Sequence, residues 1–255
     1  MRSPDELRGT FEERLESLEL SFELGKLDEV VRYALGGGGK RIRPVLCLAV
    51  TEAAGGDPRD ALDAAAALEL VHSFSLVHDD LPALDDDEER RGRPTVHVRF
   101  GEAQAILAGD ALLAEAFSLA VRYPTPEIAR EVALATSGMI GGQYLDVNGN
   151  RPDRAELNRL KTGRLFEASV GCGTWVAGLA PSAQIPWRTF GAEFGFLYQL
   201  VDDLLDDDGF VDELGRESTI ALAEETEAGV RSRLDEVDAD TSVLAGLLTE
   251  LTARR

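Results

Sequence analysis

Apolar residues recur along the chain in segments rich in helix formers, and no stretch shows the apolar–polar alternation of a half-buried strand. Residues 61–77 and 103–121 are apolar on almost all sides, which is typical of helices buried inside a protein. Glycine and proline separate the segments, for example at residues 36–39 and 124–126. The pattern predicts one all-α domain over residues 1–255, with central helices inside a ring of others.

The composition limits the classes of partner. A chain of 255 residues can bury a substantial core, and its formal charge is −21, from 26 basic and 47 acidic residues. Such acidity argues against nucleic acid or an anionic membrane surface as a partner. Cys47 and Cys172 provide no disulfide framework and no zinc spacing. The N-terminus lacks an apolar signal segment, and Asp110 and Glu115 interrupt the longest apolar stretch, so we expect a soluble, cytoplasmic protein.

The densest acidic segment follows directly after the first apolar segment and holds five aspartates within nine positions, namely Asp79, Asp80, Asp85, Asp86 and Asp87. Carboxylates at this density repel one another, and burying them is costly unless a cation binds. A solvated acidic loop is the alternative. Two features favour a site: the segment continues an apolar helix, and it ends in Arg90 and Arg91, whose side chains suit phosphate oxygens.

The geometry of this segment has to depart from a regular helix. Asp79 and Asp85 are six residues apart and would point about 240° apart on an ideal helix. Pro82, which lies between them, should break the helix. We therefore expect a distorted turn that brings Asp85 back over Asp79.

A second acidic group, within residues 199–208, contains Asp202 and Asp206, which share one helix face, with Asp203 beside them. Like charges at this spacing destabilise a helix, so their presence in an apolar segment indicates a hard cation such as magnesium. The alternative is a helix end that runs into an acidic loop.

Basic side chains are few. Residues 36–44, GGGGKRIRP, place Lys40, Arg41 and Arg43 on a glycine-rich turn that opens a helix, where backbone N–H groups can approach an anion. This is not a nucleotide-binding P-loop, because Arg41 stands where serine or threonine is required. A glycine run that only caps a helix is the alternative. Lys161 and Thr162, next to Gly163, form another candidate anion contact.

Six segments in this order resemble the trans-isoprenyl diphosphate synthase (polyprenyl synthetase) family, in particular its short-chain enzymes. They are GGGGKRIRP, HSFSLVHDDLPALDDDEERRGRPT, FGEAQAILAGDALL, GGQYLD, KTGRLFE and FGFLYQLVDDLLD, and the resemblance covers most of the chain, from about residue 35 to residue 206. The resemblance implies the all-α isoprenoid synthase (class I terpenoid synthase) helical bundle around a central cavity, as a homodimer. It also implies head-to-tail condensation of isopentenyl diphosphate with an allylic diphosphate, dimethylallyl or geranyl, through three magnesium ions.

The resemblance also assigns roles to individual residues. Asp79 and Asp85 match the first aspartate-rich motif, and Asp202 leads the second, so the implied metal ligands are Asp79, Asp80, Asp85, Asp202, Asp203 and Asp206. The positions that face the allylic diphosphate are Arg90, Lys161, Thr162 and Gln199. Those that bind isopentenyl diphosphate are Lys40, Arg43, His72 and Arg91. A plain core histidine is the alternative for His72.

The product is the next inference. In this family, the residues four and five positions before the first motif form the floor of the tail pocket, and here they are Ser75 and Phe74. The bulky Phe74 resembles farnesyl diphosphate synthases, so farnesyl diphosphate is the expected product and geranylgeranyl diphosphate the alternative. Many members carry a lysine-bearing loop after the second motif. This chain has no lysine there, and Arg216 is a candidate substitute.

Other functions stay open at this point. A class I terpene cyclase would share the fold and the first acidic motif, but would need no basic cradle for a second diphosphate. A non-catalytic subunit of a heteromeric synthase would normally have lost one of the two acidic motifs, and both are present here. A plain acidic helical scaffold would not bind diphosphate with magnesium.

Overall fold

The computed structural model describes residues 1–149 and 153–254. The α-helices are α1 (Pro4–Glu16), α2 (Leu27–Leu35), α3 (Ile42–Ala53), α4 (Leu62–Asp79), α5 (Val96–Phe100), α6 (Glu102–Ala120), α7 (Glu127–Val147), α8 (Arg154–Asn158), α9 (Arg164–Val176), α10 (Ile185–Asp206), α11 (Phe210–Leu214), α12 (Arg216–Asp235) and α13 (Ser242–Thr252). The remaining elements are the 3₁₀ turns η1 (Phe22–Leu24), η2 (Pro58–Ala61) and η4 (Pro181–Gln184), the π-helical turn η3 (Arg159–Gly163), and the antiparallel pair β1 (Glu89–Arg90) and β2 (Arg93–Pro94).

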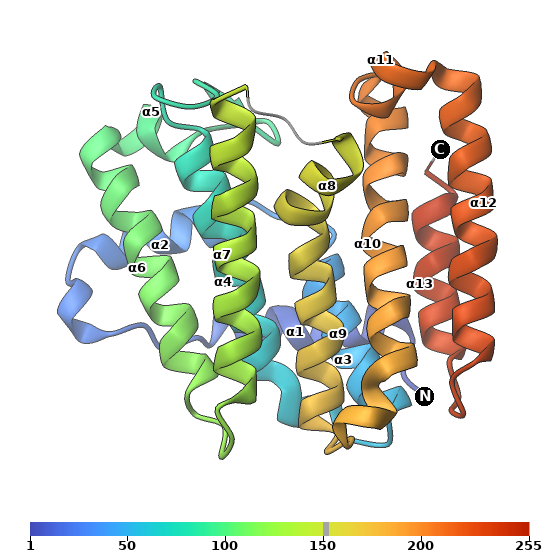
Figure 1. Ribbon diagram of the computed structural model, residues 1–255. Helices are drawn as coiled ribbons and strands as arrows, with labels where there is room; N and C mark the ends of the chain where they lie inside the picture. Colours follow the sequence, from blue (N-terminus) through green and yellow to red (C-terminus); the bar gives the residue numbers. More distant parts are fainter. Residues whose placement is uncertain (150–152, 255) are drawn as a thin grey trace.

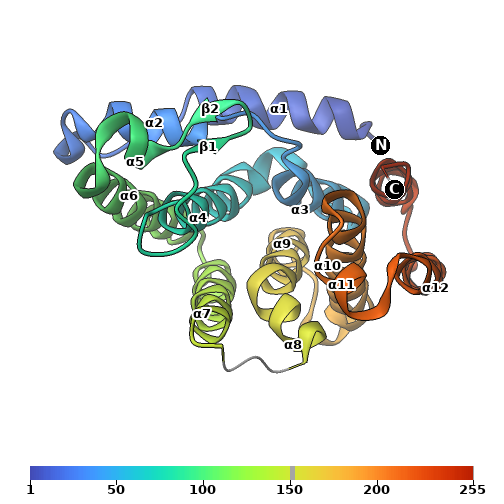
Figure 2. The same ribbon diagram turned by 90° about the horizontal axis from the view of Figure 1, so that it is seen from above.

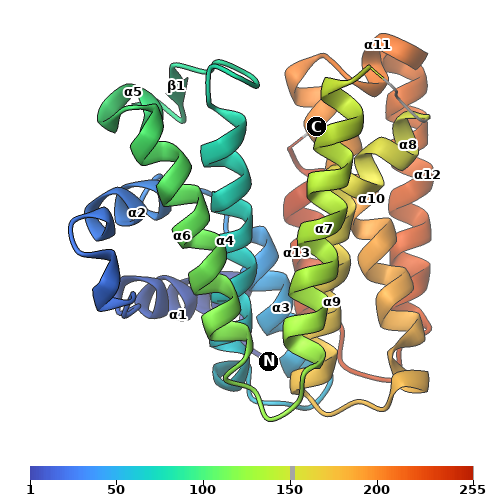
Figure 3. The ribbon, with the colours of Figure 1, turned by 60° about the vertical axis from the view of Figure 1, so that its left-hand side comes forward.

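The long helices form a bundle, as the sequence predicts. The axes of helices α4, α6, α7, α9, α10 and α12 are roughly parallel or antiparallel to one another (Figure 1). Viewed from above, α9 lies in the middle and contacts α3, α4, α7 and α10 (Figure 2). Helices α1 and α2 lie across one side of the bundle (Figures 2 and 3). The prediction of an all-α domain is confirmed, and the short β1–β2 pair is the exception to it among the described residues.

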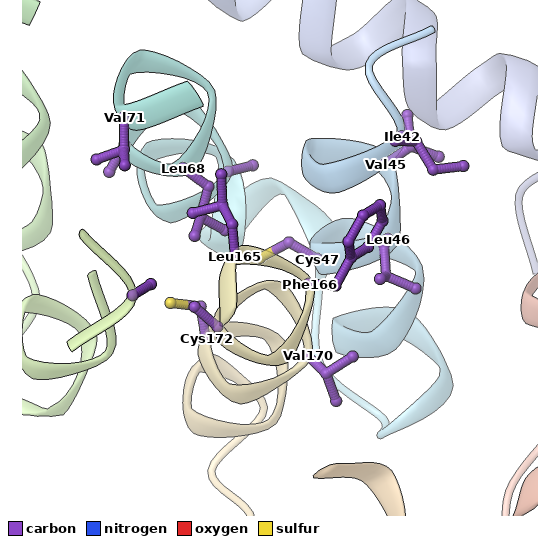
Figure 4. Close-up of a cluster of buried hydrophobic side chains, with 14 of the residues drawn as sticks. Ile42, Val45, Leu46, Cys47, Leu68, Val71, Leu165, Phe166, Val170 and Cys172 are labelled. Atoms are coloured by element: carbon purple, nitrogen blue, oxygen red, sulfur yellow. The ribbon is translucent and has the colours of Figure 1, made fainter. Parts of the chain in front are cut away.

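The centre of the core lies where α3, α4 and α9 meet (Figure 4). Apolar side chains from the three helices interlock there, and Cys47 and Cys172 are among them as free, fully buried thiols. Burial raises the pKa of Cys47 to about 12, so this thiol stays protonated and acts as an apolar group. The labelled members of this cluster are Ile42, Val45, Leu46, Cys47, Leu68, Val71, Leu165, Phe166, Val170 and Cys172.

Helix α6 departs from the expectation that residues 103–121 are buried on all sides. One face packs on α2, α4, α5 and α7, but Ile106, Leu107 and Val121 are 46%, 54% and 64% exposed. Within the described residues, α6 is also the one helix long and apolar enough to cross a membrane, although buried helices of soluble proteins meet the same criterion. The apolar pattern predicted the helix correctly, but it did not distinguish a core face from an uncovered apolar face.

Glycine permits the close contact of α3 with α9, and this contact generates a stability prediction. A Cβ atom on Gly173 would lie 2.7 Å from the Cys47 carbonyl oxygen and 2.9 Å from the Val50 side chain. Gly173→Ala should therefore lower the free energy of unfolding by about 1–3 kcal/mol through overpacking. Urea denaturation followed by circular dichroism measures the loss.

The matched control is Gly9→Ala in α1, where a Cβ would meet no atom within 4 Å. Alanine is favoured over glycine in a helix interior by about 0.5–1 kcal/mol, so this variant should be as stable as the parent or more stable. Equal denaturation midpoints for Gly173→Ala and the parent would contradict the packing account.

Candidate active site

The direction of the helices brings the predicted site residues to one end of the bundle, at the top in Figure 1. Helices α4, α7 and α10 end there, and α9 begins there after the turn η3. Both acidic groups, on α4 and α10, therefore lie at the same end as Lys161 and Thr162 on η3. Residues from α4, η3 and α10, which are far apart in the sequence, share this region.

The first acidic segment turns back on itself as expected. Helix α4 ends at Asp79, and the Asp85 backbone N–H donates to the Asp79 carbonyl oxygen at 2.9 Å. Asp86 has a φ of 56°, which lets the chain reverse after Pro82. Burial raises the pKa of the Asp79 carboxyl to about 6, and nearby Lys161 opposes the rise. A carboxylate in such surroundings gains from a cation.

Asp80 has a different environment from Asp79. Its side chain is buried and forms an ion pair with Arg90 at 2.6 Å, and Arg90 also contacts Asp87 at 3.1 Å. Burial raises the pKa of Asp80, while the hydrogen bond from Arg90 lowers it. The structure therefore joins Asp80 to the β1 strand, whereas Asp79 lines an apolar cavity. The roles of Asp80 in metal binding and of Arg90 in allylic diphosphate binding stay predictions.

In the second acidic group, Asp202 and Asp203 each have partners within the protein. Asp202 accepts from Arg254 at 3.3 Å, and burial raises its pKa. Asp203 is buried and accepts from Gln199 at 2.6 Å and from the Phe210 backbone N–H at 2.8 Å, so it fixes the start of α11. Its carboxylate lies so close to Gly209 that a Cβ there would be 2.2 Å from Oδ2. Asp206, which ends α10, is exposed.

The glycine-rich turn before α3 holds its arginines in different ways. Arg41 is buried and forms ion pairs with Glu69 and Glu12, so it has a structural role. Arg43 is buried over the ring of Phe166, 4.7 Å from its centroid, and its Nε has no hydrogen-bond partner. Burial lowers the pKa of Arg43. A buried guanidinium N–H without an acceptor favours an incoming anion.

Arg91 contacts the same turn from β1–β2. Its guanidinium donates to the Gly38 carbonyl oxygen, and a Cβ on Gly39 would lie 2.6 Å from its Nη1. Only glycine at position 39 lets this side chain approach. Lys40 is exposed, and partial loss of hydration at its ammonium group, followed by the charge of Arg254, lowers its pKa. The structure thus gathers Lys40, Arg43 and Arg91 around one turn, and their role in binding isopentenyl diphosphate stays a prediction.

Lys161 and Thr162 lie in the π-helical turn η3, a type of distortion that is frequent at functional sites. The Lys161 Nζ forms an ion pair with Asp146 at 2.6 Å, and the Thr162 hydroxyl donates to Gln199 Oε1 at 2.9 Å. Gly142 on α7 makes room for this turn, since a Cβ there would lie 2.8 Å from Lys161 Cγ. Thr162 and Gln199, which the sequence places 37 residues apart, are in direct contact.

A cavity of about 340 Å³ lies between α4 and α7, with Asp79 and Lys161 at its charged end. The rest of its lining is mostly apolar, and Phe74 and Ser75, the predicted floor, are both part of it. An apolar cavity that ends at charged groups suits a hydrocarbon chain with an anionic head. The lining residues are Phe74, Ser75, His78, Asp79, Leu84, Met139, Ile140, Gln143, Tyr144, Val147, Asn148 and Lys161.

Sequence reasoning missed two residues at this end of the bundle. Asp146, the partner of Lys161, is the last residue of the GGQYLD segment, so a signal existed. Arg254 reaches Asp202 from beyond α13 and lies 5.7 Å from the Tyr198 ring, but no motif marks it. Arg216, the candidate substitute for the missing lysines, donates to the Leu204 carbonyl oxygen and to Asp207, so it caps α10.

Comparison with known proteins settles the family. The sequence profile described as Polyprenyl synthetase matches residues 25–224, which is most of the chain. The chain belongs to the polyprenyl synthetase family. It is 42% identical to a geranylgeranyl diphosphate synthase of Cyanophora paradoxa over 201 residues, which is 73% of this chain and 67% of the relative. It is 38% identical to a farnesyl diphosphate synthase of Geobacillus stearothermophilus over 206 residues, 75% of this chain and 69% of that one.

Polyprenyl synthetase structures confirm the predicted fold. The geranyltransferase from Legionella pneumophila aligns with a TM-score of 0.88 at 30% identity, covering 98% of this chain and 96% of the other. The chain spans a smaller share, 58%, of geranylgeranyl pyrophosphate synthase 11 from Arabidopsis thaliana. The resemblance seen in the sequence and the helical isoprenoid synthase bundle are therefore confirmed.

His72 generates a prediction on pH. Burial, followed by the charges of Arg43, Arg91, Arg41 and Arg90, lowers its pKa well below the usual 6.5, so the folded chain keeps the ring neutral. The unfolded chain takes up a proton as the pH falls through about 6.5, and the free energy of unfolding then falls by up to about 1.4 kcal/mol per pH unit. His72→Gln should remove this part of the acid destabilisation, measured by urea unfolding at several pH values.

If His72→Gln and the parent lose stability equally between neutral and mildly acidic pH, the ring of His72 is not held neutral by its surroundings.

Proposed function

We propose that this chain is a magnesium-dependent prenyltransferase that condenses isopentenyl diphosphate with dimethylallyl and geranyl diphosphate, head to tail, and releases farnesyl diphosphate. One arrangement carries the proposal. Asp79 and Lys161 form the charged end of an apolar cavity, and Arg43, beside the glycine-rich turn, lies within electrostatic reach of Arg91 and of Asp202 in the second acidic group. The family membership and the names of the relatives support a prenyl diphosphate synthase.

The acidic side chains suit magnesium that is shared with a substrate. In residues 1–149 and 153–254, no three acidic, histidine or cysteine side chains stand close enough to hold a metal by themselves. Magnesium usually binds through one or two carboxylates together with substrate phosphates, so Asp79 with Asp85, and Asp202 with Asp206, fit this mode. Bound magnesium would neutralise the allylic diphosphate and favour its departure.

The residues of the chain bind and orient both substrates around the apolar cavity. Lys161, Thr162 and Gln199 would face the allylic diphosphate, and Lys40, Arg43 and Arg91 the isopentenyl diphosphate. The C–O bond of the allylic substrate breaks, its C1 bonds to the terminal alkene carbon of isopentenyl diphosphate, and a proton passes to the departing pyrophosphate. No protein nucleophile is needed, and the apolar wall keeps water from the carbocation.

The length of the product follows from the depth of the cavity. Phe74 is 8% exposed and lies in the lining one turn and a half before Asp79, where its ring limits the space for a growing tail. This favours farnesyl diphosphate. Geranylgeranyl diphosphate is the second candidate, because the relative from Cyanophora paradoxa carries that name.

A homodimer in the cytoplasm is part of the proposal. Apolar side chains on neighbouring helices α6 and α7 are uncovered, with Ile106, Leu107 and Leu134 between 46% and 59% exposed. A second copy of this chain would bury them, and the isoprenoid synthase family supports this partner. The strongly acidic composition supports a soluble protein without a nucleic-acid partner.

The proposal is tested by a product assay on the purified chain with magnesium, isopentenyl diphosphate and each allylic primer in turn. Mass spectrometry should show farnesyl diphosphate from dimethylallyl and from geranyl diphosphate, and EDTA should abolish product formation. Condensation with no primer would contradict the proposal and favour a terpene cyclase or a non-catalytic subunit.

The tail-pocket floor generates its own prediction. Phe74→Ala should open the cavity and shift the product from farnesyl to geranylgeranyl diphosphate. The matched control is Phe22→Ala, because Phe22 is 91% exposed and lies outside the cavity. This variant should keep the parental product. Farnesyl diphosphate from both variants would remove Phe74 as the floor.

A further inference from the structure

His78 lines the apolar cavity and joins α4 to α6. Its Nε2 lies 3.0 Å from the Ile106 carbonyl oxygen on α6. A carbonyl oxygen can only accept, so Nε2 carries the proton in this contact. The imidazole is therefore held in position by the neighbouring helix as well as by its own.

Gly109 forms the seat for this ring. A Cβ on Gly109 would lie 2.1 Å from His78 Nε2, 2.4 Å from Cδ2 and 2.8 Å from Cε1. No real Cβ makes contacts this short, so any side chain at position 109 would force the imidazole to move. The ring thus fills a notch that exists because residue 109 is glycine.

The same ring supports Phe74. The two residues are one helical turn apart on α4, their ring centroids are 5.0 Å apart, and the planes meet at 73° in an edge-to-face contact. Phe74 and His78 both line the cavity. The seat on Gly109, the ring of His78 and the ring of Phe74 therefore form one stack on the α4 side.

We propose that His78 is a positioning residue for product length: seated at Gly109, it holds the Phe74 ring across the tail cavity. The inference rests on the proposed prenyltransferase function and deepens it. Phe74 alone could turn away from a growing chain, because a phenylalanine side chain has two free torsions. Because His78 is held against α6 and its ring packs edge-to-face on Phe74, the Phe74 ring cannot turn into the space that the imidazole occupies.

The experiment compares the products of four purified variants with the parent, using geranyl diphosphate, isopentenyl diphosphate and magnesium. His78→Ala should let Phe74 fall back into the notch and raise the ratio of geranylgeranyl to farnesyl diphosphate on the order of tenfold, about 1.4 kcal/mol between the competing steps. His78→Gln can keep a donor near the Ile106 carbonyl and should shift the ratio less. The ratio is compared at equal consumption of isopentenyl diphosphate, so that it does not depend on how much protein is folded.

Gly109→Ala tests the stack from the other side. Its methyl group should push the imidazole towards the cavity and so shorten the pocket. In parallel assays with the two primers, the yield of farnesyl diphosphate from geranyl diphosphate should then fall relative to the yield of geranyl diphosphate from dimethylallyl diphosphate. His97→Ala, on α5 outside the cavity, is the matched control and should keep the parental product ratios.

The outcomes separate the two proposals. A parent without any condensation product overturns the proposed function and this inference with it. A parent that makes farnesyl diphosphate, with unchanged product ratios in both His78→Ala and Gly109→Ala, overturns the inference and leaves the function intact. Opposite shifts in product length from these two variants support it.

Discussion

Mutual repulsion among carboxylates, gathered at one end of an apolar bundle, is the constraint on which the rest of this structure depends. In each acidic group, the two adjacent aspartates have different surroundings, which reduces the repulsion between them. Asp80 pairs with Arg90, and Asp203 accepts from Gln199 and the Phe210 N–H, so both are neutralised or bonded within the protein. Burial raises the pKa of all four carboxyls, and that of Asp79 reaches about 6. Asp202 pairs with Arg254 at 3.3 Å, so the electrostatic cost falls most on Asp79, where an external cation would relieve it.

Glycine determines where the charged side chains can stand. Gly39, Gly142 and Gly209 each leave space that Arg91, Lys161 and Asp203, respectively, occupy, and a Cβ at any of the three would lie within 3 Å of that side chain. These contacts join segments that are far apart in the sequence, except for the local one at Gly209. The placement of charge is therefore set by backbone approach as much as by the charged residues. A substitution of such a glycine would move a charged group without removing it.

The sequence predicted the fold class, the family and the return of the chain at Asp85, because helical periodicity, the helix break at Pro82 and the motif order are all local signals. It did not predict the separate environments of Asp79 and Asp80, because Arg90 is placed by a hairpin that local patterns barely mark. It assigned no role to Arg254, whose contact with Asp202 spans 52 residues and has no motif. The uncovered face of α6 was also missed, since periodicity reports apolarity and not what covers it.

The same separation of local and tertiary signals explains why product length is harder to infer than chemistry. The groups that would hold diphosphate come from motifs that relatives named for farnesyl and for geranylgeranyl products are expected to share. The depth of the cavity depends instead on a few ring contacts, and the position of the Phe74 ring depends on the residue that packs against it. That residue, His78, is held by a carbonyl and a glycine of another helix. Overall similarity averages over such contacts, so product length has to be argued from the helix pair that supports the floor.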